Sequence, residues 1–306
     1  MESVEAQTEY TLAIALKFTS PTEDSPTMLR SSNPTQRPDV FGAAQTWEDL
    51  EARGVSTPPK EKFKAEPGKM SLQGTINKTL ILLGLCAATA VATWEMVTPT
   101  GNAPVQVGYG LPLFGGLIAG LVFALITVFK PKAAPVTAPL YAIAEGAFLG
   151  AISGMYAERF GSIENGAVSL NSDMVLQAIM LTFGVLGAML VAYTTRLIKP
   201  TERFKTGVIA ATGAVFLVYL VSIIMNMFGA AMPLLHDSGP IGIGISLVIV
   251  AIAALNLVLD FDYIEQGVNV GAPKYCEWYG GFTLLVTLVW LYLEILRLLS
   301  KFQSRD

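Results

Sequence analysis

Acidic residues inside long apolar stretches are the feature of this sequence that could carry chemistry. Asp260, Asp262 and Glu265 close the apolar run LNLVLDFDYIEQG, and Glu277 and Glu294 lie in the following run, PKYCEWYGGFTLLVTLVWLYLEILRLL. A carboxyl group in lipid hydrocarbon is costly unless it is paired, protonated or hydrated, so such residues are functional candidates by default. The chemistry they suggest is the binding or transfer of protons or cations.

Helix geometry suggests a pairing between Asp260 and Glu277. If the first helix ends at Gly267, Asp260 lies about 10 Å below its end, and Glu277 lies about 6 Å inside a helix opened by Pro273. Two carboxyls at similar depth on antiparallel helices cannot both ionise easily, so they would share a proton. Loss of that proton would push the helices apart. We therefore predict a pH-responsive latch, whose open form is an oxygen-lined passage suited to hard cations such as Ca²⁺.

The other acids have two readings each. Asp262 follows Asp260 by two residues, so the two side chains point about 200° apart and one of them faces the headgroups. Glu145, in YAIAEGAFLGAISG, is either a hydrogen-bonding anchor between helices or part of the pore or proton site. Glu294 lies about 25 Å beyond Glu277. It is either an interfacial carboxylate near Arg297 or a secondary member of the pathway.

The composition indicates a membrane protein. Of 306 residues, 52% are hydrophobic and 14% are charged, whereas soluble domains carry about 25% charge. Apolar runs near the length of a membrane-spanning helix recur along the chain, and many are rich in Gly and Ala, which favours close helix packing. They cover residues 76–97, 107–129, 136–157, 173–195, 206–228, 239–262 and 275–299. We predict an all-α seven-transmembrane helix bundle, residues 71–303, behind a disordered tail, residues 1–70.

The distribution of basic residues in the tail and the loops predicts the orientation of the protein in the membrane. Residues 1–70 are rich in Ser, Thr, Pro, Glu and Lys without periodicity, which is typical of disorder. Basic residues concentrate before span one and after spans two and four, and are almost absent from the opposite loops. The positive-inside rule then predicts a cytoplasmic N-terminus and, with seven crossings, an external C-terminus. Met28 is a second candidate start codon.

Several functional classes are disfavoured. The sequence has no P-loop, no HExxH and no GxSxG, and no nucleophile with a matching base, so we expect no enzyme and no cofactor. His236 beside Asp237 reads as a solvated loop. Cys86 and Cys276 make neither a disulfide framework nor a metal site. The net charge of −4, without a basic patch, makes nucleic acid an unlikely partner.

Three segments carry a family resemblance: AEGAFLGAIS around Glu145, LNLVLDFDYIEQG around Asp260, and GAPKYCEWYGGFTLLVTLVWLYLEILRLL around Thr287. They resemble the Bax inhibitor-1 family of seven-span membrane proteins, in particular a bacterial branch, over about residues 70–303. MLRSSNP at Met28 also resembles the start of that branch. The resemblance places the protein in a bacterial plasma membrane.

The resemblance implies a pair of aspartates on the last two spans that governs a pH-sensitive calcium leak. Asp260 matches the first aspartate, and Glu145 matches the glutamate of the family's Glu-Gly motif. The position of the second aspartate falls on Thr287, which cannot titrate. Either Glu277 replaces it from one side, or this branch lacks the latch. Family members are also linked to suppression of cell death in eukaryotes and to regulation of membrane proteolysis in bacteria.

Two functions therefore compete. The first is a pH-sensitive leak pathway for calcium or protons, gated by acids on the last two spans. The second is a non-transporting regulator that binds a membrane protease or another membrane complex. The buried acids favour the first, and the long tail and missing aspartate favour the second. Beyond the lipid bilayer, the sequence specifies neither the partner nor the oligomeric state.

Overall fold

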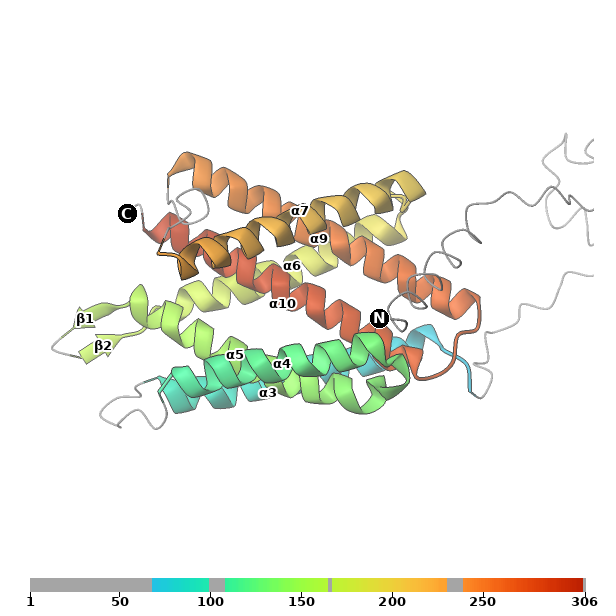
Figure 1. Ribbon diagram of the computed structural model, residues 1–306, viewed down its shortest axis with the longest axis horizontal. Helices are drawn as coiled ribbons and strands as arrows, with labels where there is room; N and C mark the ends of the chain where they lie inside the picture. The colour runs from blue at the N-terminus through green and yellow to red at the C-terminus, as the bar shows by residue number, and fades with distance from the viewer. Residues whose placement is uncertain (1–67, 99–107, 165–166, 230–238, 305–306) are drawn as a thin grey trace, which may run out of the picture. The chain divides into compact units, whose positions relative to one another are not determined.

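The structure is a computed structural model that describes residues 68–98, 108–164, 167–229 and 239–304. Most of the predicted tail, Met28 and the loop with His236 lie outside the described residues. Seven helices of the described part are long and apolar enough to cross a membrane, as predicted. The elements are α3 (Leu72–Val97), α4 (Gly110–Phe129), the 3-10 turn η3 (Pro131–Ala133), α5 (Ala134–Arg159), β1 (Ser162–Glu164), β2 (Ala167–Ser169), α6 (Ser172–Thr194), α7 (Glu202–Met227), α9 (Pro240–Asn269) and α10 (Cys276–Gln303) (Figure 1).

Local sequence explains where several of these helices begin and end. Ser71, Asn171 and Thr201 cap α3, α6 and α7, and each side chain accepts a hydrogen bond from the backbone N–H three residues later. Helix α9 starts at Pro240, a residue suited to the first helical position because its missing N–H needs no partner there. Gly271, with φ of 66°, turns the chain between α9 and α10.

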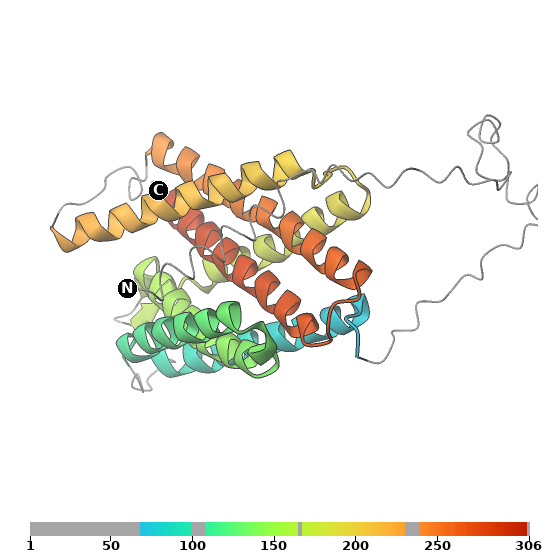
Figure 2. The ribbon, with the colours of Figure 1, turned by 45° about the vertical axis from the view of Figure 1, so that its right-hand side comes forward.

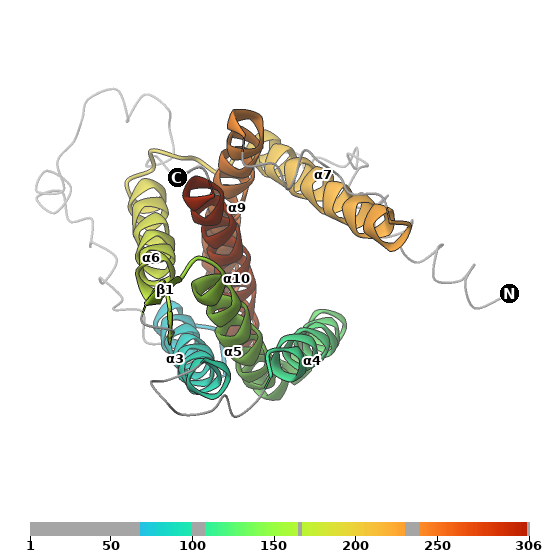
Figure 3. The same cartoon turned by 90° about the vertical axis from the view of Figure 1, so that its left-hand side faces the viewer.

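Helix α10 is the centre of the bundle. It contacts α3, α5, α6 and α9, and in the view along the helices it lies between them (Figure 3). Of its most apolar stretch, 67% is buried, against 17% for α4 and for α7. Those two helices are peripheral, since α4 packs mainly on α5 and α7 mainly on α9. Figure 2 shows α10 in red between the group formed by α3, α4 and α5 and the pair formed by α9 and α7.

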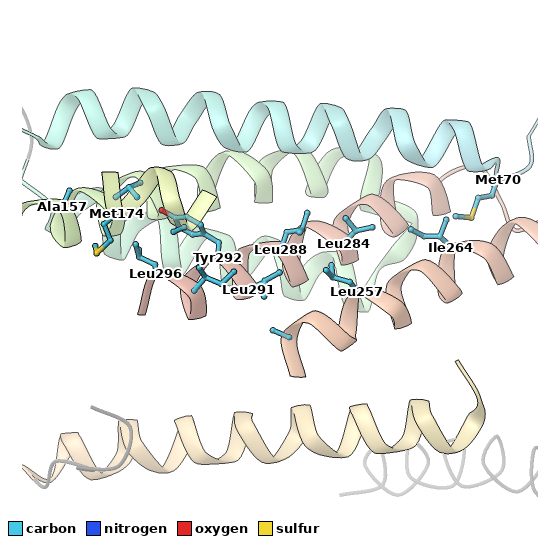
Figure 4. Close-up of a cluster of buried hydrophobic side chains, with 14 residues drawn as sticks. Met70, Ala157, Met174, Leu257, Ile264, Leu284, Leu288, Leu291, Tyr292 and Leu296 are labelled. Carbon is cyan, nitrogen blue, oxygen red and sulfur yellow. The ribbon is translucent and has the colours of Figure 1, made fainter. Parts of the chain in front are cut away.

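The largest apolar cluster runs along α10. Met70 and Ile264 lie at one end, Leu257 and Leu288 near the middle, and Leu296 at the other end (Figure 4). A second cluster joins α3, α5 and α10 through Leu82, Tyr141 and Phe282, among others. Large side chains on the outer faces of α4 and α7 are exposed, as expected for helices that face lipid.

Two segment boundaries in the structure differ from the predicted ones. Helix α9 continues past residue 262, the predicted end of span six, and past Gly267, to Asn269. Residues 68–70, which the predicted boundary assigns to the tail, belong to the bundle. The N–H of Met70 donates to the Ala272 carbonyl at 2.7 Å, and the Met70 side chain is buried in the main cluster. The hairpin of β1 and β2, antiparallel with Ile163 opposite Val168, was not predicted.

Candidate functional site

Asp260 lies on α9 at the interface with α10. Its carboxyl faces the side-chain hydroxyls of Thr283 and Thr287, which are one turn apart on α10. The Oδ2 atom is buried and has no hydrogen-bond partner among the described residues. Buried polar atoms are nearly always satisfied, so such an atom calls for an explanation such as a function, a water or an ion.

The two threonine hydroxyls can form hydrogen bonds with Asp260 whether its carboxyl is protonated or ionised. Thr283 Oγ1 lies 3.0 Å from the Gly280 carbonyl, and Thr287 Oγ1 lies 3.3 Å from the Thr283 carbonyl. A hydroxyl has one proton, so it donates either to the helix backbone or to Asp260. When it donates to the backbone, its oxygen can accept a hydrogen bond from a neutral carboxyl or contact a cation. The site is therefore a small group of oxygens that can exchange hydrogen bonds.

Asn256 extends the polar face of α9 by one turn. Its Nδ2 donates to Thr212 Oγ1 on α7 at 2.8 Å and to the Ile252 carbonyl at 2.8 Å. Leu257 and Val258, the residues between Asn256 and Asp260 that point into the core, are fully buried. The polar groups thus form a narrow strip in an otherwise apolar environment.

The structure does not bring Asp260 and Glu277 together. Glu277 is 2% exposed and belongs to the contact between α10 and α3. Its Oε1 accepts hydrogen bonds from Ser71 Oγ at 2.9 Å and from the Ser71 N–H at 3.1 Å. Asp260 faces Thr283 and Thr287, six and ten residues further along α10. The predicted pairing of these two carboxyls in a latch is therefore wrong in geometry.

The helix ends explain the error. Because α9 ends at Asn269 rather than at Gly267, Asp260 lies nine residues inside it, about 13 Å. Because α10 begins at Cys276 rather than at Pro273, Glu277 lies in its first turn, about 2 Å inside. The depths of the two carboxyls thus differ by roughly 12 Å.

Asp262 points away from Asp260, as the helical spacing predicts. It forms an ion pair with Lys205 of α7 at 2.8 Å, and Lys205 also pairs with Glu202 at 3.0 Å. Gln266, one turn later, also donates to Asp262. Asp262 therefore joins α9 to the start of α7 rather than to α10. Glu265 accepts a hydrogen bond from the Tyr193 hydroxyl of α6.

Glu145 occupies a separate polar position among α3, α4 and α5. Its carboxyl interacts with the Tyr141 hydroxyl and lies near the Cys86 thiol. On α4, Gly120 leaves room for it, since a Cβ there would lie 3.3 Å from Glu145 Oε1. Its Oε2 is buried without a hydrogen-bond partner in the described part of the chain. The structure does not place Glu145 beside Asp260, and both of its sequence-based readings stay open.

Glu294 lies near Arg297, but it is buried between α10 and α7. The Tyr219 hydroxyl of α7 donates to Glu294 Oε1 at 2.7 Å, and Arg297 Nη1 lies 3.4 Å from the same oxygen. Arg297 also stacks over the Tyr219 ring at 4.9 Å and donates to its hydroxyl. This charge-balanced group joins α10 to α7, so Glu294 is hydrogen-bonded to Tyr219 and paired with Arg297 rather than with Asp260.

Sequence reasoning missed three residues of these sites. Thr283 had a signal, because it precedes Thr287 by one turn and shares its face of the helix. Ser71 had only the weaker signal of a helix cap. Lys301 is buried, and its Nζ donates to the Gly242 carbonyl at 2.9 Å, which joins the end of α10 to the start of α9. In the residues that the structure describes, no group of three or more His, Cys, Asp or Glu side chains could hold a metal ion.

Seven long apolar helices in the described part of the chain, one of them central and buried, with isolated acids inside, define a multi-pass α-helical membrane protein. A family model described as Bax inhibitor 1 like matches residues 23–304, nearly the whole chain. The chain therefore belongs to the Bax inhibitor 1 like family, as the resemblance predicted. No curated protein and no solved structure matches it.

Proposed function

We propose that the protein is a pH-sensitive leak pathway for calcium ions or protons, in which Asp260 is the residue that responds to pH. The observation that carries this proposal is the buried Asp260 Oδ2 without a partner, facing two hydroxyls on the central helix. Thr287 occupies the position of the second aspartate in the family resemblance, so one carboxyl and two hydroxyls would stand where relatives have two carboxyls.

The expected pH response follows from the cost of a buried charge. A neutral Asp260 can donate to a threonine oxygen and leave α9 and α10 closely packed. An ionised Asp260 needs donors, water or a cation around it, because an uncompensated charge in low dielectric is strongly unfavourable. Ionisation therefore favours a hydrated, more open interface, and flux should rise as pH rises.

Flux from purified full-length protein in liposomes tests this proposal. Vesicles with a trapped calcium dye or a trapped pH dye would be compared across a range of pH for the wild type, Asp260→Asn and Asp262→Asn. Asp262 is the matched control, because it lies two residues away and pairs with Lys205 on another face. Asp260→Asn should remove the pH dependence and Asp262→Asn should retain it. No flux above empty vesicles in the wild type would overturn the proposal.

One observation favours the second candidate function. Neither Glu277 nor Glu294 lies beside Asp260, so the site has a single carboxyl where a calcium ion usually finds several oxygen ligands of negative charge. A non-transporting regulator that binds a membrane protease or another membrane complex needs no such site. A wild type without flux that still copurifies with a membrane protein would support this candidate.

We further propose that the N-terminus faces the cytoplasm of a bacterial cell. Successive helices of the bundle run in opposite directions. One side of the bundle therefore holds the starts of α3, α5, α7 and α10 and the ends of α4, α6 and α9. That side carries the basic residues Lys69, Lys78, Lys130, Lys132, Arg196, Lys199, Arg203, Lys205 and Lys274. Reporter fusions after Pro131, Pro200 and Asp306 test the orientation. A cytoplasmic signal at Asp306 would contradict it.

A further inference from the structure

A groove of about 420 Å³ lies between α3 and α6, with α5 and α10 as its floor. Its rims carry Ala87 and Val91 of α3 and Leu176 and Ile179 of α6. The floor includes Leu288 of α10. The groove takes no part in the site at Asp260, which lies on the side of α10 that faces α9.

The groove is about as long as one leaflet of a bilayer. Its lining extends along α3 from Leu83 to Trp94 and along α6 from Ser172 to Phe183, twelve residues with a rise of about 16 Å in each case. The hydrocarbon core of a membrane is about 30 Å thick, so half of it is about 15 Å. The Trp94 and Ser172 ends lie at the membrane surface, since they are near the end of α3 and the start of α6.

The residues that line the groove favour an apolar occupant. Two hydroxyls in its wall, Ser153 and Tyr292, lie 2.6 Å apart and bond to each other. Ser153 also lies 2.6 Å from the Leu149 carbonyl, and Thr182 donates to the Ala178 carbonyl at 2.7 Å. These hydroxyls are satisfied within the protein. The polar residue at the mouth is Ser172, and Trp94 is the type of side chain that favours the membrane interface.

The groove is continuous with the surface that contacts lipid. Val91 is 61% exposed, and Leu176 and Phe183 are 56% and 51% exposed, although each lines the groove. Helices that cross a bilayer present such residues to acyl chains. An empty groove in hydrocarbon would lose dispersion contacts along its walls, so the adjoining chains are the available occupants.

We infer that the groove between α3 and α6 binds one acyl chain of a phospholipid from the leaflet around Trp94. The chain enters beside Ser172 and ends near Cys86 and Phe183, close to the middle of the membrane. The lipid headgroup stays at the surface, where the groove opens. This site is independent of the leak pathway, and its test does not use flux.

Native mass spectrometry of the delipidated full-length protein with added dioleoyl phosphatidylcholine tests the inference. The wild type should retain one lipid. Ala87→Trp fills the groove and should reduce retention about tenfold. Ala88→Trp is the matched control, because Ala88 is also exposed on α3 but does not line the groove. It should retain lipid as the wild type does.

A second pair of variants keeps the test valid if the first groove variant does not fold. Leu176→Trp blocks the opposite rim, whereas Met180→Trp adds the same side chain to a residue of α6 that is 73% exposed and outside the groove. Thermal unfolding in detergent reports folding of all four variants. The inference is overturned if the folded wild type retains no lipid, if the folded groove variants retain as much as their controls, or if free oleate binds and the phospholipid does not.

Discussion

Glu277 and Asp260 lie on consecutive spans and both place carboxylate oxygens out of contact with solvent, yet the surroundings of the two groups differ. Glu277 accepts two hydrogen bonds from Ser71 and lies in the first turn of α10, beside the start of α3. Two helix N-termini thus favour its negative charge. Asp260 lies in the interior of α9 and has one oxygen without a partner. Burial alone therefore does not single out a candidate acid. A buried carboxylate oxygen without a partner does, and in the described residues it marks Asp260 and Glu145.

Removal of Glu277 should have the largest effect on stability. Glu277→Ala leaves the Ser71 donors without their acceptor and opens a cavity between α3 and α10, so we expect a loss of about 4 kcal/mol in the free energy of unfolding. Glu277→Gln keeps an acceptor oxygen and should lose about 1 kcal/mol. Denaturant unfolding in detergent measures both. Equal small losses would mean that Glu277 does not hold the helices together.

Gly74 tests the same contact from α3. A Cβ at Gly74 would lie 2.0 Å from Glu277 Oε1, so Gly74→Ala must displace the carboxylate from Ser71. We expect a loss of about 2 kcal/mol. Gly84→Ala on the same helix is the control, since a Cβ there meets nothing within 4 Å. It should change stability by about 1 kcal/mol or less. If Gly74→Ala leaves the free energy of unfolding unchanged, the close packing of Gly74 on Glu277 is contradicted.

Asp260 should behave in the opposite way in a stability measurement. Asp260→Asn keeps the shape, removes the potential charge and supplies donors for the oxygens of Thr283 and Thr287. We expect the free energy of unfolding to change by less than about 1 kcal/mol or to rise. The same unfolding experiment provides the value. A loss as large as that of Glu277→Ala would make Asp260 a structural residue and remove the contrast between the two sites.

Much of the fold could be predicted from the sequence because it depends on local patterns. Runs of about 20 apolar residues set the seven spans, and the spacing of Asp260 and Asp262 set their opposite faces. The packing order could not be predicted in this way. The central position of α10 and the peripheral positions of α4 and α7 depend on contacts between segments that are far apart in the sequence. The only local indication of such contacts is a high density of small residues.

The candidate site was predictable in part. Asp260 stood out as an acid in an apolar helix, but its predicted partner depended on the helix ends. Errors of two residues at the end of α9 and three at the start of α10 raised the difference in depth between the two carboxyls from about 4 Å to roughly 12 Å. The role of Ser71 depended on how α3 meets α10, which no local pattern specifies. Thr283 and Thr287 face Asp260 because two long helices pack in one register.

The pH dependence of flux in liposomes, measured side by side for Asp260→Asn and Glu277→Gln, tests the central claim most directly. We expect Asp260→Asn to abolish the rise of flux with pH while the protein stays as stable as the wild type. Glu277→Gln should keep the pH dependence of the wild type and lose stability. The opposite pattern, a flat profile for Glu277→Gln and an unchanged profile for Asp260→Asn, would contradict the assignment of function to the unsatisfied carboxyl.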